Sequence, residues 1–316
     1  MFCLIPESAN PYFNLALEEI LLKKHDQEFL ILGINNPSVI IGKHQSAHRE
    51  VNTSFVSGNN IPVIRRISGG GTVYHDQGNL NFAFISNSEP GRQIDFRKYT
   101  EPVIGFLQSL GVNARFEGKN DIKVDGLKIS GNAEHVFRNR VLHHGTLLFN
   151  ASLETLRNSL RKDFACYATR AVQSNPSSVM NLADILKEFS DAYSLREAMC
   201  SYLTDQKHIL PGYVISAREL AEAEALAQSK YMTWEWNFAY GPEYSFNNSY
   251  LLEGNECSCS LSVKDGIIIE CSLKGRNDLV NISNKLIGCR HMPEDLRKVF
   301  ESENISISEE DIFKLF

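Results

Sequence analysis

Three consecutive glycines, Gly69–Gly71, begin three residues after the pair Arg65-Arg66 and lie between the strand-like segments Ile61–Ile64 and Leu80–Ile85. Glycine permits a positive φ and lets a ligand approach the backbone closely. Successive backbone N–H groups in such a turn can bind an anion, and an adjacent arginine suits bidentate contact with phosphate or carboxylate. The alternative is a flexible hairpin turn with solvated arginines. The arginine pair and a second polar cluster about fifty residues downstream favour the anion site.

Length and charge restrict the class of protein. The chain has 316 residues, 43% of them hydrophobic, which predicts one large domain, or one large and one small domain. The net charge of −6 is unlike that of a general nucleic-acid binder. Positive charge around the glycines therefore stands against an acidic background, as expected for a site that binds a small anion.

The N-terminus lacks a basic segment followed by an apolar one, and no apolar run has membrane-spanning length, so we expect a cytoplasmic protein. Seven cysteines, an odd number, favour free thiols over a disulfide framework. Cys257, Cys259, Cys271 and Cys289 could instead bind zinc, but they lack the usual C-x2–4-C spacing.

Strand and helix patterns mix without strict alternation, which favours an α+β fold with a mixed or largely antiparallel sheet. Strands are predicted at 29–33 and 38–42, joined by the turn residues 35–37, and at 121–130 (as a hairpin) and 143–149. Helices are predicted at 14–22, 54–59, 100–110 and 153–160, with mostly helical chain from 180 to 230. The pattern changes near 242, which predicts a large domain over 1–242 and a small one over 243–316. The small domain should hold a hairpin turning at 264–266 and two helices near 281–287 and 295–300.

Lys128 and Asp121 belong to a second cluster. Lys128 lies on a short apolar strand that leads into Ser130-Gly131, and it could hold a phosphate or an acyl carbonyl. It could equally be an exposed strand lysine. Asp121 could bind Mg²⁺ together with phosphate oxygens, or it could be a turn residue.

Two adjacent histidines, His143 and His144, form the third cluster. Neighbouring residues of a strand face opposite sides, so the two cannot bind one metal ion, and one of them should face the site. His75 is either a site residue or a structural one. Cys166 is a candidate acyl-accepting nucleophile, although no base lies near it in the sequence.

In order and spacing, these clusters resemble the lipoate–protein ligase family. The matching segments are Arg65–Asn79 (RRxSGGGxVxHDxGN), Lys119–Asp121, Lys128–Gly131 (KISG) and His143–Leu148 (HHGTLL), with Phe13–Glu19, Val39–Gln45 and Thr233–Phe238 outside them. The resemblance covers nearly the whole chain. It implies a biotin/lipoate-ligase-like α+β catalytic domain followed by a small accessory domain.

The resemblance also implies an activity. Such an enzyme activates lipoate with ATP and Mg²⁺ to give lipoyl-AMP and pyrophosphate, and transfers the lipoyl group to a lysine of an acceptor. The implied acceptors are lipoyl domains of 2-oxoacid dehydrogenase complexes and the glycine-cleavage H protein. A monomer that binds neither nucleic acid nor membrane is implied as well.

Site residues carry over by position, with Lys128 as the catalytic residue and Asp121 as the candidate Mg²⁺ ligand. The implied ATP and adenylate ligands are Arg66, Gly71, Thr72, Val73, Tyr74, Lys119, Asp121 and Lys128. The implied lipoate ligands are Ser68, Gly70, Gly71, His75, Lys128, His144 and Thr146.

Two departures from the family pattern leave more than one activity open. Lys119 stands where an arginine is usual, and the stretch 172–182 lacks the arginines of an SVRSRVxNL-like segment. The second departure resembles the mitochondrial lipoyltransferase branch, which uses preformed lipoyl-nucleotide. The sequence also allows a Cys166-linked octanoyl or lipoyl acyltransferase, and a non-catalytic binding module.

Overall fold

The computed structural model describes residues 1–89, 91, 94–207, 209–252 and 254–316. The chain forms two compact units, each assembled from three segments. The first unit comprises Met1–Lys43, Ile64–Arg157 and Asn175–Met232, and the second comprises His44–Val63, Asn158–Ser174 and Thr233–Phe316. The predicted α+β class is confirmed. The predicted domain boundary after residue 242 stays a prediction.

A seven-stranded sheet forms the centre of the first unit, in the order β1-β2-β6-β10-β9-β8-β7. Only β1 and β2 pair in parallel; the other pairs are antiparallel. The strands are β1 (Phe2–Leu4), β2 (Phe29–Ile34), β6 (Asn79–Asn87), β7 (Arg115–Glu117), β8 (Asp121–Val124), β9 (Leu127–Phe137) and β10 (Arg140–Leu148). The predicted hairpin at 121–130 and the strand near 143–149 are thereby confirmed.

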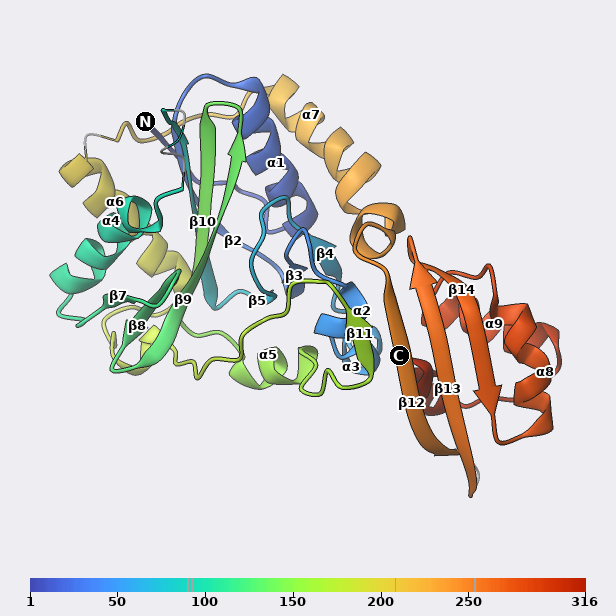
Figure 1. Cartoon of the computed structure of the whole chain (residues 1–316). Helices are drawn as coiled ribbons and strands as arrows, with labels where there is room; N and C mark the ends of the chain where they lie inside the picture. Colours follow the sequence, from blue (N-terminus) through green and yellow to red (C-terminus); the bar gives the residue numbers. More distant parts are fainter. Residues whose placement is uncertain (90, 92–93, 208, 253) are drawn as a thin grey trace. The chain divides into compact units, whose positions relative to one another are not determined.

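Helices pack on both faces of this sheet (Figure 1). On one face lie α4 (Phe96–Ser109) and α6 (Ala192–Lys207), and they complete the main apolar core with residues such as Val103, Phe106 and Leu195. On the other face lie α1 (Pro11–Lys24) and α7 (Ala217–Leu226), which continues into η2 (Ala227–Tyr231). Asn10 caps α1 by accepting from the backbone N–H of Tyr12 and Phe13.

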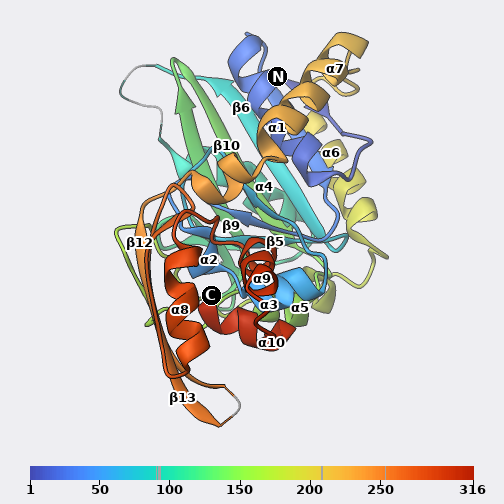
Figure 2. The ribbon, with the colours of Figure 1, turned by 90° about the vertical axis from the view of Figure 1, so that its right-hand side faces the viewer.

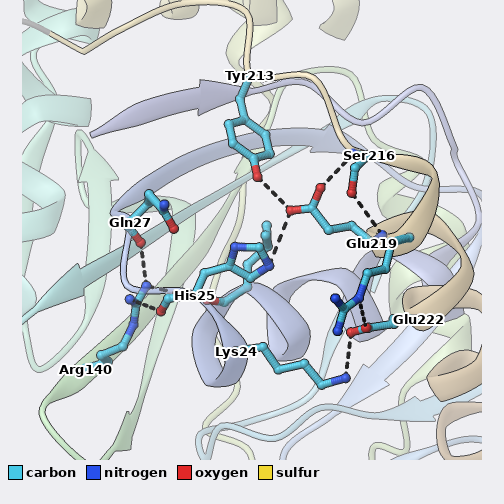
Figure 3. Close-up of polar contacts among 10 residues, drawn as sticks. Lys24, His25, Gln27, Arg140, Tyr213, Ser216, Glu219 and Glu222 are labelled. Atoms are coloured by element: carbon cyan, nitrogen blue, oxygen red, sulfur yellow. Dashed lines mark hydrogen bonds and ion pairs between the residues drawn. The ribbon is translucent and has the colours of Figure 1, made fainter.

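Polar contacts connect α7 to the C-terminal end of α1 (Figure 3). Glu219 accepts hydrogen bonds from the Tyr213 hydroxyl at 2.6 Å and the Ser216 backbone N–H at 2.7 Å, and it lies 3.3 Å from the His25 ring. Arg140 of β10 donates to the carbonyl oxygens of His25 and Gln27, which follow the last turn of α1. The position of α1 over the sheet is therefore fixed from two sides.

A second, three-stranded sheet has the order β4-β3-β5, with strands β3 (Ser38–Ile41), β4 (Val63–Arg65) and β5 (Val73–His75). The glycine triplet joins β4 to β5, which lie on either side of β3, so the hairpin interpretation of this turn is wrong. The predicted strands at 29–33 and 38–42 exist, but they belong to different sheets. Residues 35–37 therefore connect two sheets rather than two neighbouring strands.

The second unit contains a sheet of order β11-β12-β13-β14, with helices packed beside it (Figure 2). Asp265 and Gly266, with φ of 50° and 72°, form the predicted hairpin turn between β13 and β14. The elements are α2 (Ala47–Glu50), α3 (Thr53–Gly58), β11 (Tyr167–Thr169), η3 (Glu235–Ala239), β12 (Tyr244–Leu252), β13 (Asn255–Lys264), β14 (Ile267–Lys274), α8 (Asn277–Leu286), α9 (Pro293–Ser302), α10 (Glu309–Ile312) and η4 (Phe313–Leu315).

Two short helices complete the fold: α5 (Leu153–Ser159), close to the predicted 153–160, and η1 (Leu182–Asp184). Within the described ranges, no helix combines the length and the hydrophobicity needed to cross a membrane. All seven cysteines are free thiols.

Candidate functional site

The side chain of Arg66 holds the glycine loop in place through hydrogen bonds. Its guanidinium donates to the carbonyl oxygens of Gly69 (2.5 Å), Gly71 (2.7 Å) and Ile40 (3.1 Å), and its Nε–H donates to Ser68 Oγ at 2.9 Å. The side chain is buried, and burial lowers its pKa to about 10, so it remains a cation at neutral pH. The structure thus places this charge under the loop, with its N–H groups directed at the loop's own backbone.

Close packing holds the loop against two strands. Of the three glycines, only Gly70 has a positive φ, of +84°. A Cβ at Gly42, just after β3, would lie 2.2 Å from the Gly70 carbonyl oxygen, so only glycine fits there. The Cβ position of Gly70 lies 3.5 Å from Ala133 Cβ on β9. The loop therefore rests on the β9 face at Ala133.

Lys128 reaches the same face because β9 carries a bulge. The pairing of β8 with β9 shifts between Ile122 and Lys123, which re-aims the lysine side chain. Its Nζ lies 3.0 Å from the Cβ position of Gly131 and 2.8 Å from Asp121 Oδ1, and Asp121 is the strand partner of Gly131. The lysine is half-buried in an ion pair rather than freely exposed.

Gly131 and Ala133 are two residues apart on β9, and alternate strand residues share a face about 7 Å apart. The ammonium group above Gly131 and the glycine loop above Ala133 are therefore neighbours on one face of the sheet. This arrangement brings together two clusters that lie far apart in the sequence.

His144 connects this face to α1. It pairs with Ala133 across the strands, its Nε2 lies 2.6 Å from Ser68 Oγ, and its Nδ1 lies 2.8 Å from Glu18 Oε2. A neutral imidazole satisfies both contacts, with Nδ1–H donating to the carboxylate and Ser68 O–H donating to Nε2. The chain Arg66–Ser68–His144–Glu18 is thus continuously hydrogen-bonded.

His143 points to the opposite face, as the strand alternation predicts. It is fully buried, with Nδ1 2.9 Å from Glu134 Oε1 and Nε2 3.2 Å from Asn132 Oδ1. Burial is the largest cause that lowers its pKa. It packs against Phe82 and Tyr99 in the core and is not part of the site face.

His75 is held in one tautomer. Asn14 Nδ2 donates to Asn35 Oδ1 at 2.7 Å, so the Asn35 amide group faces the ring with its Nδ2, which donates to His75 Nδ1 at 3.0 Å. The proton must then be on Nε2, a buried atom to which the described part of the chain offers no hydrogen-bond partner. Burial, together with Arg66 and His144, lowers the pKa of His75 to about 3. An unpaired buried donor of this kind fits a ligand oxygen.

The other predicted ligands differ in how deeply they are buried. Thr146 is buried on β10, two residues beyond His144. Thr72 and Val73 are half-buried, and Tyr74 is buried with its pKa raised to about 12, chiefly by burial. Lys119 is exposed in the turn before β8.

The segment with the missing arginines runs beside Lys128. The Lys128 backbone N–H donates to the Ser178 carbonyl at 2.9 Å, and its carbonyl accepts from the Met180 N–H at 3.2 Å. A substitution in this segment would therefore change the immediate surroundings of Lys128.

Metal ligands are sparse. Among the described residues no group of three or more His, Cys, Asp or Glu side chains could hold a metal ion. Mg²⁺ needs only one or two carboxylates when phosphate oxygens supply other ligands, so Asp121 could contribute one oxygen, in competition with Lys128. Cys166 belongs to the second unit, where it packs half-buried against that unit's apolar core.

Glu18, Asn14 and Asn35 are the site residues that the sequence reasoning missed. Asn14 and Glu18 lie in the predicted amphipathic helix, and Asn35 lies in a predicted turn. The sequence signal that could have identified Asn14 and Glu18 is their place on the inward side of this helix, because buried polar groups need partners.

Comparison with known proteins shows the family of this chain. The family model for the lipoyl protein ligase A/B catalytic domain matches residues 10–204. Lipoate–protein ligase 1 of Staphylococcus aureus is 35% identical, covering 97% of this chain and 93% of its own. Lipoate-protein ligase LplJ of Bacillus subtilis is 34% identical, covering 97% and 96%.

Solved structures agree as well. A bi-partite lipoate protein ligase of Thermoplasma acidophilum, studied with its E2 lipoyl domain, superposes with a TM-score of 0.65 at 28% identity, covering 75% of this chain and 95% of that one. A Ta0514 structure from T. acidophilum with bound lipoic acid (TM-score 0.65) and a lipoate-protein ligase A bound with ATP (0.64) each show 28% identity and cover 75% of this chain and 98% of theirs.

The fold, the family model and these relatives define a lipoyl protein ligase of the A/B class. The chain belongs to this family, as the resemblance predicted.

Proposed function

We propose that the chain is an ATP-dependent lipoate–protein ligase. In the first step, a lipoate carboxylate oxygen attacks the α-phosphorus of ATP; an O–P bond forms and pyrophosphate leaves. In the second step, the ε-amine of an acceptor lysine attacks the acyl carbonyl of lipoyl-AMP. An amide forms, AMP leaves, and the amine proton is released.

The observation that carries this proposal is the position of Lys128 beside the loop braced by Arg66. Two anions must meet in the first step, and negative charge grows on phosphorus and carbonyl oxygens. A fixed ammonium next to a rigid, cation-backed loop stabilises that charge without reorganisation. Lys128 would exchange its contact with Asp121 for contacts to the acyl carbonyl and the phosphate. No side-chain nucleophile is required, because the adenylate is itself reactive.

The remaining predicted ligands fit supporting roles. Gly71, Thr72, Val73, Tyr74 and Lys119 would line the nucleotide, with Arg66 acting through the loop and its charge. Ser68, Gly70, His144 and Thr146 would border lipoate, and His75 Nε2–H would donate to a ligand oxygen. Asp121 would supply one ligand to Mg²⁺, which neutralises phosphate charge when bound.

Acceptors, location and oligomeric state belong to the same proposal. Lipoyl domains of 2-oxoacid dehydrogenase complexes and the glycine-cleavage H protein are the expected acceptors, and a relative has been solved as a system with its E2 lipoyl domain. We expect a cytoplasmic monomer.

The test is lipoylation of a lipoyl domain, followed by intact mass. One reaction contains free lipoate, ATP and Mg²⁺, and the other contains synthetic lipoyl-adenylate alone. We expect the lipoyl mass increase in both reactions. Absence of product in both would reject the proposal.

A transfer-only lipoyltransferase is the second candidate. The observation that favours it is the absence of arginines in the segment that pairs with Lys128. Activity with the adenylate but not with lipoate and ATP would establish it. A Cys166-linked acyl route is a third candidate, which full activity of Cys166→Ser would dismiss.

A further inference from the structure

Two thiols from opposite ends of the first unit's sequence meet in its core. Cys3 lies in β1 and Cys200 in α6, and their Sγ atoms are 3.1 Å apart. A disulfide bond requires about 2.0 Å, so the sulfurs need to approach by only about 1 Å. This separation falls within the reach of a side-chain rotation and small backbone adjustments.

The backbone on both sides is already fixed. The Cys3 N–H donates to the Leu210 carbonyl at 2.7 Å, and its carbonyl accepts from the Tyr213 N–H at 3.1 Å. On α6, Leu195, Met199 and Leu203 are fully buried, which sets the direction in which Cys200 points. The thiol pair is therefore held in register before any reaction.

The two thiols differ in access and in acidity. Cys3 is buried, whereas Cys200 is only half-buried. The hydrogen bond from Cys3 is the largest cause that lowers the pKa of Cys200, to about 7, while the same contact and burial raise the pKa of Cys3. A thiol with a pKa near the ambient pH is the most effective attacking group in disulfide exchange.

We propose that Cys3 and Cys200 form a thiol–disulfide exchange site that reacts with a low-molecular-weight disulfide of the glutathione type. The product is a reversible disulfide bond between β1 and α6. The Cys200 thiolate attacks one sulfur of the reagent, a mixed disulfide forms and one thiolate leaves. Cys3 then loses its proton and attacks Cys200 Sγ, expelling the second thiolate. The two cysteines are oxidised by two electrons, and the reagent is reduced to two thiols.

This disulfide bond would close a loop that contains the glycine triplet, Lys128 and His144. Closing a long loop restricts the unfolded chain, so the oxidised protein should be more stable than the reduced one. Both cysteines belong to the apolar core that α4 and α6 complete, whereas His144 of the candidate site contacts α1 on the other face of the sheet, so turnover at moderate temperature should not change. This inference is independent of the proposed function.

The test treats the full chain with oxidised glutathione and follows intact mass, free thiols and the melting temperature. The wild type should lose two of its seven free thiols without retaining glutathione. A peptide map should link the segments around residues 3 and 200, and the melting temperature should rise and return on reduction. Cys289→Ser, which removes a half-buried thiol of the second unit, should behave like the wild type.

Single variants distinguish the order of the steps. Cys3→Ala should trap one glutathione on Cys200, whereas Cys200→Ala should form neither an adduct nor a cross-link at Cys3. A wild type that keeps glutathione on Cys200 without the cross-link, or that links other cysteines, would overturn the proposal. The wild-type peptide map decides this even if a variant folds poorly.

Discussion

At the scale of single residues, the glycine loop depends on Gly42, which is not among the predicted ligands but packs directly against the loop. Gly42→Ala would place a Cβ 2.2 Å from the Gly70 carbonyl oxygen, so the loop must move. Because a displacement of about 1 Å in a catalytic site can cost about 100-fold in rate, we expect kcat/KM to fall by about that factor. Gly58→Ala, where a Cβ meets nothing within 4 Å, is the matched control. Equal activity of the two variants would show that the loop position is unimportant.

A second residue-scale prediction concerns the tautomer of His75. Asn35→Leu removes the amide that donates to Nδ1, so the Nε2–H form is no longer imposed. We expect lipoate to bind about fivefold to tenfold more weakly, because one hydrogen bond contributes about 1 kcal/mol. Calorimetry measures the affinity, and nitrogen NMR of the imidazole reports the tautomer. Asn36→Ala, at an exposed position, should change neither quantity; an unchanged Asn35→Leu would remove His75 from the ligand contacts.

At the scale of elements, α1 owes its position to a buried carboxylate. Glu19 accepts hydrogen bonds from Lys23, Lys230 and the Tyr231 hydroxyl, which link α1 to η2. Burial alone would raise the pKa of Glu19, but these three partners outweigh burial and hold the pKa below its usual value. Since Glu18 is the adjacent residue, this anchor also fixes the carboxylate that binds His144.

Glu19→Gln should therefore destabilise the fold. Lys230 would lose its buried ion pair, and we expect the free energy of unfolding to fall by about 2 kcal/mol. Urea unfolding measures this change. The comparison is Glu222→Gln, which removes the more exposed ion pair with Lys24 shown in Figure 3 and should cost clearly less stability than Glu19→Gln. A larger loss for Glu222→Gln would contradict this ranking.

Some features of these elements could be predicted from the sequence, and others could not. Strand alternation correctly separated His143 from His144, and Asp125-Gly126 correctly marked the β8–β9 hairpin. The pairing of β3 with β5, and of His144 with Glu18, could not be predicted because both depend on how distant segments pack. The bulge that aims Lys128 could not be predicted either, because Leu127 and Ile129 alternate regularly with Lys128 and Ser130 through it.

At the scale of the whole molecule, buried neutral histidines should make stability depend on pH. The folded pKa is about 3 for His75 and about 4 for His291, with burial as the largest cause in each. Both lie below the ordinary value of about 6.5, so the unfolded chain binds more protons as the pH falls below that value. The stability that these residues provide is complete above pH 6.5 and declines towards pH 4.

When the pH is lowered from 7.5 to 5.5, the free energy of unfolding should fall by about 1.4 kcal/mol for each of these two histidines. Urea titrations at both pH values measure the difference. In His291→Gln, an amide N–H can still donate to the Leu315 carbonyl, as Nε2–H does in the wild type. This variant should show a smaller pH dependence by about that amount, and an unchanged dependence would exclude His291 as a source.

The central claim is that Lys128 and the loop braced by Arg66 act together on the acyl and phosphate groups. Its most direct test is the single-turnover rate of lipoyl-adenylate formation in Lys128→Ala, compared with Lys123→Ala. Lys123 is the strand partner of Lys128 and forms an ion pair with Glu117. By analogy with the loss of one preorganised donor, we expect Lys128→Ala to be slower by about 100-fold to 1,000-fold and Lys123→Ala to match the wild type. A folded Lys128→Ala protein that forms the adenylate at the wild-type rate would contradict the claim.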